Sequence, residues 1–337
     1  MTKLHTNIPF GYFTGIIILL SLIFTSVSYA QYNGECWAAD YTNVFIIAAD
    51  GSASQIGGFS QPMSISINPN DGTAWVADTD MIQVRKFSPQ GQELKKLDGA
   101  ANASLFAKTP QTLTNPISVA VDPNDGACWV ATKNNIIKFS PEAKQLFIQE
   151  GFNEPFLAVN PNNGDCWVAD SSNARVVRLS KQGKQLDVIQ IDEITQPKSI
   201  SVNPADGSCW ILDPFTYIAA KISSDGKISS KFNVVGNDMA MMATAIAASS
   251  DGGCWVGLMI DMMNDKVIKL SADGKRSLEV AGFGMPSRLV EDPRDKSCWV
   301  ADTNGGQIAK ISAGGQMTPY IQGLQQPKVV EVASPVK

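Results

Sequence analysis

The chain has 337 residues, and its 27 Lys plus Arg against 32 Asp plus Glu give a formal net charge of −5. This mildly acidic balance argues against nucleic acid or an anionic membrane surface as the main partner. His5 is the only histidine, so the rest of the chain has no imidazole base, no Ser-His-Asp apparatus and no His-ligated metal or haem.

Residues 1–30 have the pattern of a secretory signal peptide. Lys3 gives a basic start, residues 16–24 form a short apolar core, and Ser28-Tyr29-Ala30 is a small-x-small cleavage site. The core is shorter than the roughly 20 apolar residues that a membrane span needs, although a retained N-terminal anchor is the alternative. We therefore expect export to the periplasm or an equivalent compartment. Cleavage would leave 26 basic residues (27 − 1) against 32 acidic ones, a charge of about −6.

Seven tryptophans mark a repeat that runs through residues 31–337. Most are spaced 38 to 45 residues apart, a period that suits one β-propeller blade. The fullest copies are residues 62–78 and 197–213, where an alternating strand, an Asn-Pro-x-Asp-Gly turn and a second strand with Trp follow one another. The seven tryptophans are Trp37, Trp75, Trp129, Trp167, Trp210, Trp255 and Trp299.

Each repeat predicts four short strands, which we call a to d. The chain opens on strand b at residues 34–37 and closes on a lone strand a at residues 327–332, so its two ends are out of phase with the repeat. Pairing the C-terminal strand with the N-terminal blade completes the ring and removes its open edges. The sequence therefore predicts an all-β fold, a single seven-bladed propeller domain of four-stranded antiparallel blades over residues 31–337.

The repeat Pro-x-Ser-Ile-x-Val-Asn/Asp-Pro-x-Asp-Gly-x-x-Trp-Val-Ala-Asp resembles the NHL-type propeller repeats over about residues 34–333. Many members of that family have six blades, whereas seven Trp-centred units favour seven here. The family includes binding modules, enzymes and complex subunits, so the resemblance implies a fold without choosing a function.

Six cysteines each precede a tryptophan on strand b. Equivalent positions on neighbouring blades should lie beyond the roughly 7 Å limit for a disulfide, so we expect buried free thiols, with three disulfides as the alternative. An aspartate that follows Trp-Val-Ala in five repeats is expected to bond backbone N–H groups of the nearby turns. The sequence offers no catalytic, cofactor or metal residues, although calcium in the turns stays open.

Strand a should line the central channel, mostly with small side chains such as Ser64 and Ser66. Only Arg288 and Glu331 are charged among the expected axis-facing residues. We interpret them as a channel ion pair, with an acid–base pair as the alternative. A calcium-dependent propeller hydrolase would need several converging carboxylates, and the channel lacks them.

The sixth blade breaks the pattern, since Ala243 replaces the usual Pro and Leu258 the usual Asp. Loops 99–114, 214–217, 236–243 and 257–265 should emerge on one face, because d–a and b–c connections share a side of the disc. We expect them to bind a protein partner. Self-packing loops and a thioether copper site are the alternatives. The candidate residues are Met239, Met241, Met242, Met259, Met262, Met263, Leu105, Phe106, Phe215 and Tyr217.

The export signal, the seven blades, the lack of haem motifs and the loop-rich face together resemble the haem-free propeller subunits of exported multi-haem oxidoreductases. That resemblance implies no cofactor in this chain and haem c on partner subunits. It also implies that the 236–265 loops lie against a partner. A free-standing propeller that binds a small ligand or peptide at the channel mouth is the second hypothesis, and a propeller lyase or hydrolase the third.

Overall fold

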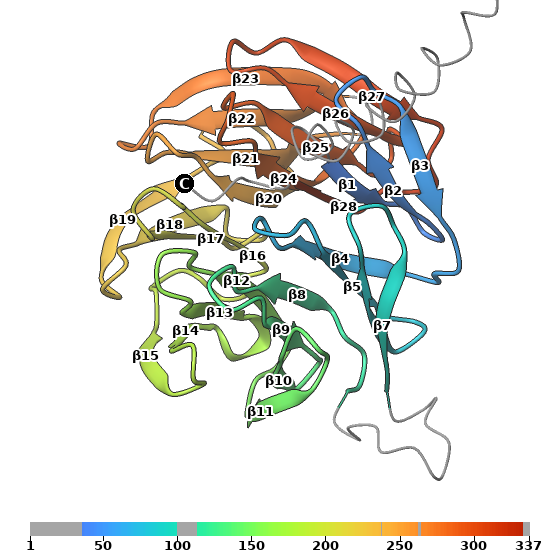
Figure 1. Cartoon of the computed structure of the whole chain (residues 1–337). Helices are drawn as coiled ribbons and strands as arrows, with labels where there is room; N and C mark the ends of the chain where they lie inside the picture. Colours follow the sequence, from blue (N-terminus) through green and yellow to red (C-terminus); the bar gives the residue numbers. More distant parts are fainter. Residues whose placement is uncertain (1–35, 100–112, 237, 262–263, 333–337) are drawn as a thin grey trace, which may run out of the picture.

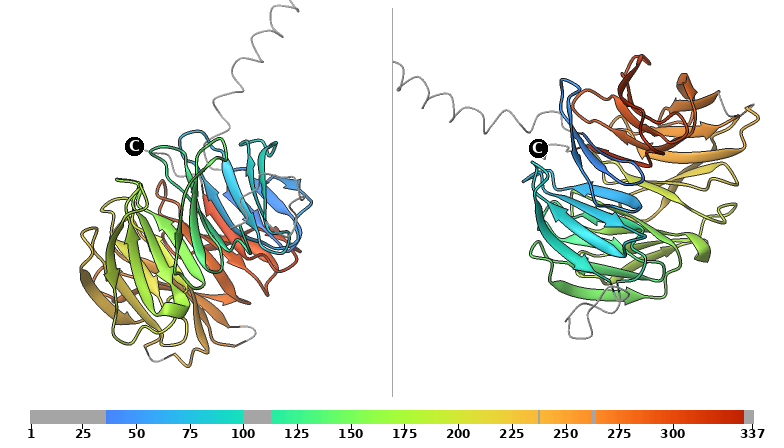
Figure 2. Two further views of the ribbon diagram at one scale, coloured as in Figure 1. Left: turned by 90° about the horizontal axis from the view of Figure 1, so that it is seen from below. Right: turned by 90° about the vertical axis from the view of Figure 1, so that its right-hand side faces the viewer.

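The computed structural model describes residues 36–99, 113–236, 238–261 and 264–332. Seven four-stranded antiparallel sheets surround a common centre (Figure 1). Figure 2 shows the same ring from two other sides. The predicted seven-bladed, all-β propeller is therefore confirmed. The expected signal peptide lies outside the described residues, and within those residues no helix is long and apolar enough to cross a membrane.

The inner two strands of every blade carry most of the repeat. The innermost strands, strand a of the repeat, are β4 (Pro62–Ile67), β8 (Ser118–Val121), β12 (Pro155–Val159), β16 (Ser199–Val202), β20 (Met242–Ala248), β24 (Pro286–Glu291) and β28 (Val329–Val332). The second strands, strand b, are β1 (Cys36–Ala39), β5 (Ala74–Asp78), β9 (Cys128–Ala131), β13 (Cys166–Asp170), β17 (Cys209–Leu212), β21 (Cys254–Met259) and β25 (Cys298–Asp302).

The outer two strands complete each sheet. The third strands are β2 (Val44–Ile47), β6 (Gln83–Phe87), β10 (Asn135–Phe139), β14 (Arg175–Leu179), β18 (Ile218–Ile222), β22 (Asp265–Leu270) and β26 (Gln307–Ile311). The outermost strands are β3 (Ala53–Ile56), β7 (Glu93–Asp98), β11 (Gln145–Glu150), β15 (Gln185–Ile189), β19 (Ile228–Asn233), β23 (Arg276–Phe283) and β27 (Met317–Gln322).

Burial falls from the inside of each blade to the outside. The second strands are almost wholly buried, because the faces of two neighbouring blades cover them, whereas the outermost strands expose most of their side chains. Seven apolar clusters fill the spaces between adjacent blades, and each draws on two of them. The core is thus a ring of inter-blade contacts, which explains why the repeat keeps Trp, Val and Ala on the second strand.

The ring closes as the sequence predicts. Strand β28 pairs antiparallel with β1, with Glu331 opposite Trp37, so that one blade has the order β28-β1-β2-β3. Every innermost strand contacts the innermost strands of both neighbouring blades, including β28 with β24 and β4. Closure therefore joins the two ends of the chain in one sheet.

Candidate functional site

Serine side chains of the innermost strands support the centre of the ring. Their hydroxyl oxygens accept backbone N–H groups of the next innermost strand, which would otherwise have no partner at a strand edge. The bonds are Ser64 with Val119 (3.1 Å), Ser66 with Val121 (3.0 Å), Ser118 with Leu157 (3.2 Å), Ser199 with Ile246 (2.9 Å) and Ser201 with Ala248 (2.9 Å). These hydroxyls therefore have a structural role.

Two charged side chains meet in the channel. Arg288 Nη2 of β24 lies 3.6 Å from Glu331 Oε2 of β28. Burial raises the pKa of Glu331 from 4.5 to about 7, although the Arg288 guanidinium lowers it in part. This contact joins the last two innermost strands of the ring. Val329 of the same strand is buried at 2% exposure in the core around Trp37.

The recurrent aspartates hold the loops that begin each blade. Asp213 accepts backbone N–H groups from Thr195 and Gln196 on one loop and from Phe215 and Thr216 on the next. The other four, Asp40, Asp78, Asp170 and Asp302, also accept backbone N–H groups. Their predicted structural role is confirmed.

In the sixth blade, an aspartate on the third strand takes over the role of the recurrent aspartate on the second strand. Leu258 occupies the usual position and is fully buried. Asp265, the first residue of β22, is also fully buried, and its Oδ1 accepts the N–H groups of Ile260 (2.7 Å) and Asp261 (3.1 Å). Burial raises the pKa of Asp265 above its ordinary value. A buried acid thus still orders this loop.

Exposed apolar side chains gather beside that loop. Met239, Met241 and Phe215 are 90%, 65% and 52% exposed. The Tyr217 hydroxyl donates to the Met241 carbonyl (3.3 Å), and the Met241 N–H donates to the Met259 carbonyl (2.7 Å). These bonds bring Tyr217, Met241 and Met259 together, and we call Phe215, Tyr217, Met239 and Met241 the methionine surface.

Not every predicted residue lies on this surface. Met242 and Met259 are half-buried and face one another at the ends of β20 and β21, so the expectation that they belong to loops is wrong. β20 begins at Met242, one residue before Ala243, whereas β4 and β24 begin at the Pro of the repeat. Residues Leu105, Phe106, Met262 and Met263 lie outside the described part of the chain.

The methionine surface has a well-anchored base. Asp238 forms ion pairs with Arg276 (2.8 Å) and Lys266 (3.4 Å), which come from β23 and β22. Beside it, the Lys198 ammonium lies 5.7 Å from the centre of the Phe215 ring. The loop is thus held by charges at its base while Met239 and Met241 project from it.

The six cysteines are free and fully buried, as predicted. Burial raises the pKa of the Cys128 and Cys254 thiols far above the ordinary range, so they stay protonated and unreactive. In the described residues, no group of three or more His, Cys, Asp or Glu side chains is placed to hold a metal ion.

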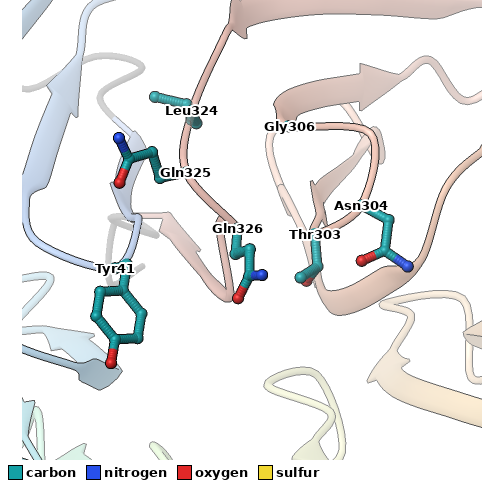
Figure 3. A pocket seen from close by; sticks show the side chains of 7 residues that line it. All are labelled: Tyr41, Thr303, Asn304, Gly306, Leu324, Gln325 and Gln326. Atoms are coloured by element: carbon teal, nitrogen blue, oxygen red, sulfur yellow. The ribbon is translucent and has the colours of Figure 1, made fainter.

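Two features were missed from the sequence. In six blades a Lys or Arg of the third strand lies over the tryptophan ring of the second strand, as Lys138 does over Trp129 at 5.0 Å. The second feature is a pocket of about 600 Å³ at the closure of the ring, lined by Tyr41, Gln326 and neighbouring residues (Figure 3). A basic residue eleven positions after Trp75, Trp167, Trp210 and Trp299 could have indicated these contacts between cations and tryptophan rings.

Comparison with known proteins identifies the fold and leaves the family open. No family model and no curated protein matches the chain. A streptogramin B lyase structure has 15% identity and a TM-score of 0.65, covering 85% of this chain and 90% of that one. Hydrazine synthase of Kuenenia stuttgartiensis has 12% identity and a TM-score of 0.60, covering 74% and 76%.

A functionally unknown protein from Desulfotomaculum acetoxidans has 14% identity and a TM-score of 0.68, covering 90% of this chain and 100% of that one. At identities this low the likeness concerns architecture, because one propeller fold supports unrelated activities. The chain is therefore similar to a structurally broad set of propellers that includes a lyase and hydrazine synthase.

Proposed function

We propose that this chain is a non-catalytic subunit of an exported, multi-haem oxidoreductase complex of the hydrazine synthase kind, which acts in anaerobic ammonium oxidation. In this proposal haem c is held by partner subunits, and the propeller docks on them through the methionine surface. The working compartment would be the periplasm or, in an anammox bacterium, the lumen of the anammoxosome.

The exposure of Met239, Met241 and Phe215 is the observation that carries the proposal. Large apolar side chains gathered on one face of a soluble protein mark a site of association, and methionine adapts to an irregular partner surface. Because Asp238 and Asp213 hold the loops beneath this surface, docking should cost little conformational entropy.

The chemistry of the described residues also supports a subunit without its own reaction. The thiols are buried and protonated, the inner serines bond to backbone, and the charged channel groups Arg288 and Glu331 contact one another. Likeness to the hydrazine synthase structure adds a precedent for this architecture within a redox enzyme.

The test is purification of the native protein from its source, with intact-complex mass and a visible absorption spectrum on the same fraction. We expect a heteromer with a Soret band. The triple variant Phe215→Ser, Met239→Ser, Met241→Ser should keep the fold and lose co-purification with its partners, because each side chain is at least half exposed.

A matched control replaces three apolar residues that are also exposed but lie on outermost strands. Leu146, Leu186 and Ile228 are 52%, 41% and 44% exposed, and their replacement by Ser should leave assembly unchanged. A colourless monomer from the native source, or equal assembly of the two triple variants, would reject the proposal.

A free-standing propeller that binds a small ligand at the channel mouth is the second candidate. The Arg288–Glu331 pair favours it, because two charged side chains of the innermost strands meet there. Such a protein would purify as a monomer and be stabilised by its ligand, which distinguishes it from a complex subunit.

A further inference from the structure

The pocket at the closure of the ring lies beside a connection that departs from a recurring motif. Three d–a connections have the sequence Gly-Phe-x-x-Pro, at residues 58–62, 151–155 and 282–286, and the closing connection has Gly-Leu-Gln-Gln-Pro at 323–327. The three phenylalanines Phe59, Phe152 and Phe283 are at most 7% exposed and fill the space between blades.

Leu324 takes the same place at the closing connection. Its N–H donates to the Gly306 carbonyl (2.9 Å), as the N–H of Phe59 does to Thr42 (3.3 Å) and that of Phe152 to Asn134 (3.3 Å). A pocket of about 600 Å³, open to solvent, lies beside this connection. This volume lies within the range of roughly 300–1,000 Å³ that small-molecule sites occupy.

The walls of this pocket are neutral and rich in hydrogen-bonding groups. They comprise Tyr41, Thr303, Asn304, Gly306, Leu324, Gln325 and Gln326 (Figure 3). The side-chain amides of Gln325 and Gln326 have no hydrogen-bond partner in the described part of the chain. Asp40 lies next to the pocket, but its carboxylate accepts the backbone N–H groups of Thr42 and Asn43.

The backbone around the pocket is held in place. The Tyr41 N–H donates to the Gln325 carbonyl (3.0 Å), and the Thr303 hydroxyl contacts the Pro327 carbonyl (2.8 Å) and the Ser287 hydroxyl (2.6 Å). These contacts tie loops of two blades together, so the walls are preorganised for a ligand. Tyr41, which follows β1 and is 40% exposed, forms one wall of the pocket.

We propose that this pocket binds a neutral, hydroxyl-rich ligand of the size of a mono- or disaccharide. A charged ligand would lack a counter-charge among the residues that line the pocket, and a wholly apolar ligand would cover the Gln326 carboxamide without offering it a hydrogen bond. Sugar hydroxyls both donate and accept, as carboxamides do. Tyr41 and Leu324 offer apolar surface to the C–H faces of the ring.

This inference does not depend on the proposed subunit role. The test is titration of the purified full chain with cellobiose, N,N′-diacetylchitobiose and the uncharged peptide acetyl-trialanine amide, monitored by saturation-transfer NMR and calorimetry. We expect saturable binding of a disaccharide. Leu324→Phe, which restores the motif of the other connections, should weaken that binding by about tenfold or more.

Leu94→Phe is the matched control, because Leu94 is 43% exposed on outermost strand β7, and it should bind as the wild type does. If Leu324→Phe fails to fold, the double variant Asn304→Ala, Gln326→Ala takes its place, with a loss of about tenfold from two hydrogen bonds. No saturable disaccharide binding, preference for the peptide, or unchanged binding by the pocket variants would overturn the assignment.

Discussion

Many polar side chains of this propeller make contacts within or between its blades. The inner serines accept backbone N–H groups of the next blade, and the third-strand cations lie over tryptophan rings. Glu331 differs from these residues, because it is a carboxyl group in the channel whose only ionic contact among the described residues is Arg288.

Glu331 should make the stability of the fold depend on pH. Its pKa rises from 4.5 to about 7 on folding, so the folded state binds the proton more tightly. The resulting stabilisation is complete below pH 4.5 and is lost as the pH rises through about 7. Relative to Glu331→Gln, the wild type should lose about 2 kcal/mol of unfolding free energy between about pH 5 and about pH 8.5.

Urea unfolding of both proteins at the two pH values measures this difference. The comparison cancels the titration of every other group that the two proteins share. A constant difference between wild type and variant across the range would show that Glu331 titrates normally in the folded state.

Among the elements, the sixth blade shows how the repeat tolerates a lost residue. Its b–c loop has no aspartate on the second strand, yet Asp265 reaches the same backbone groups from the third strand. Asp265 therefore supplies the acceptor for two backbone N–H groups of the b–c loop, whereas Asp213 of a regular blade also binds two N–H groups of the d–a loop.

Asp265→Ala should destabilise the fold by about 2 kcal/mol, since two buried N–H groups would lose a charged or strongly polar acceptor. Asp265→Asn should retain most of the stability, because a carboxamide oxygen can accept both bonds. Chemical unfolding of the three proteins provides the measurement, and equal losses for the Ala and Asn variants would contradict this role.

At the scale of the whole molecule, stability depends on joining the two ends of the chain. Val329, Val330 and Val332 of β28 are at most 4% exposed, and they pack into the clusters on both sides of the closing blade. Among the described strands, β28 is the one that pairs with the inner side of β1. Without β28 its edge would be open to other chains.

Ending the chain at Lys328 should therefore cost about 5 kcal/mol or more, from three buried valines at roughly 1.5–3 kcal/mol each. It should also promote aggregation. Urea unfolding and size-exclusion chromatography measure both effects, with a chain ending at Val332 as the control. Equal unfolding midpoints for the two truncated chains would mean that closure contributes little.

Much of this architecture was predictable because it repeats. A motif present in seven copies defines its own alignment, so blade number, strand order, free thiols and ring closure could be inferred before any contact was known. The candidate site was harder, because it lies where the repeat fails. Met242 and Met259 were expected in loops, yet they pair as strand ends.

The sequence by itself determined the seven blades, the pairing of the chain ends and the structural role of the recurrent aspartates, because local patterns and turn residues specify them. Only the tertiary structure decided that Met239 and Met241 project, that Asp265 substitutes for a missing acid, and that a pocket lies beside Leu324. These features depend on side-chain size and on contacts between residues far apart in the chain, and no local pattern records such contacts.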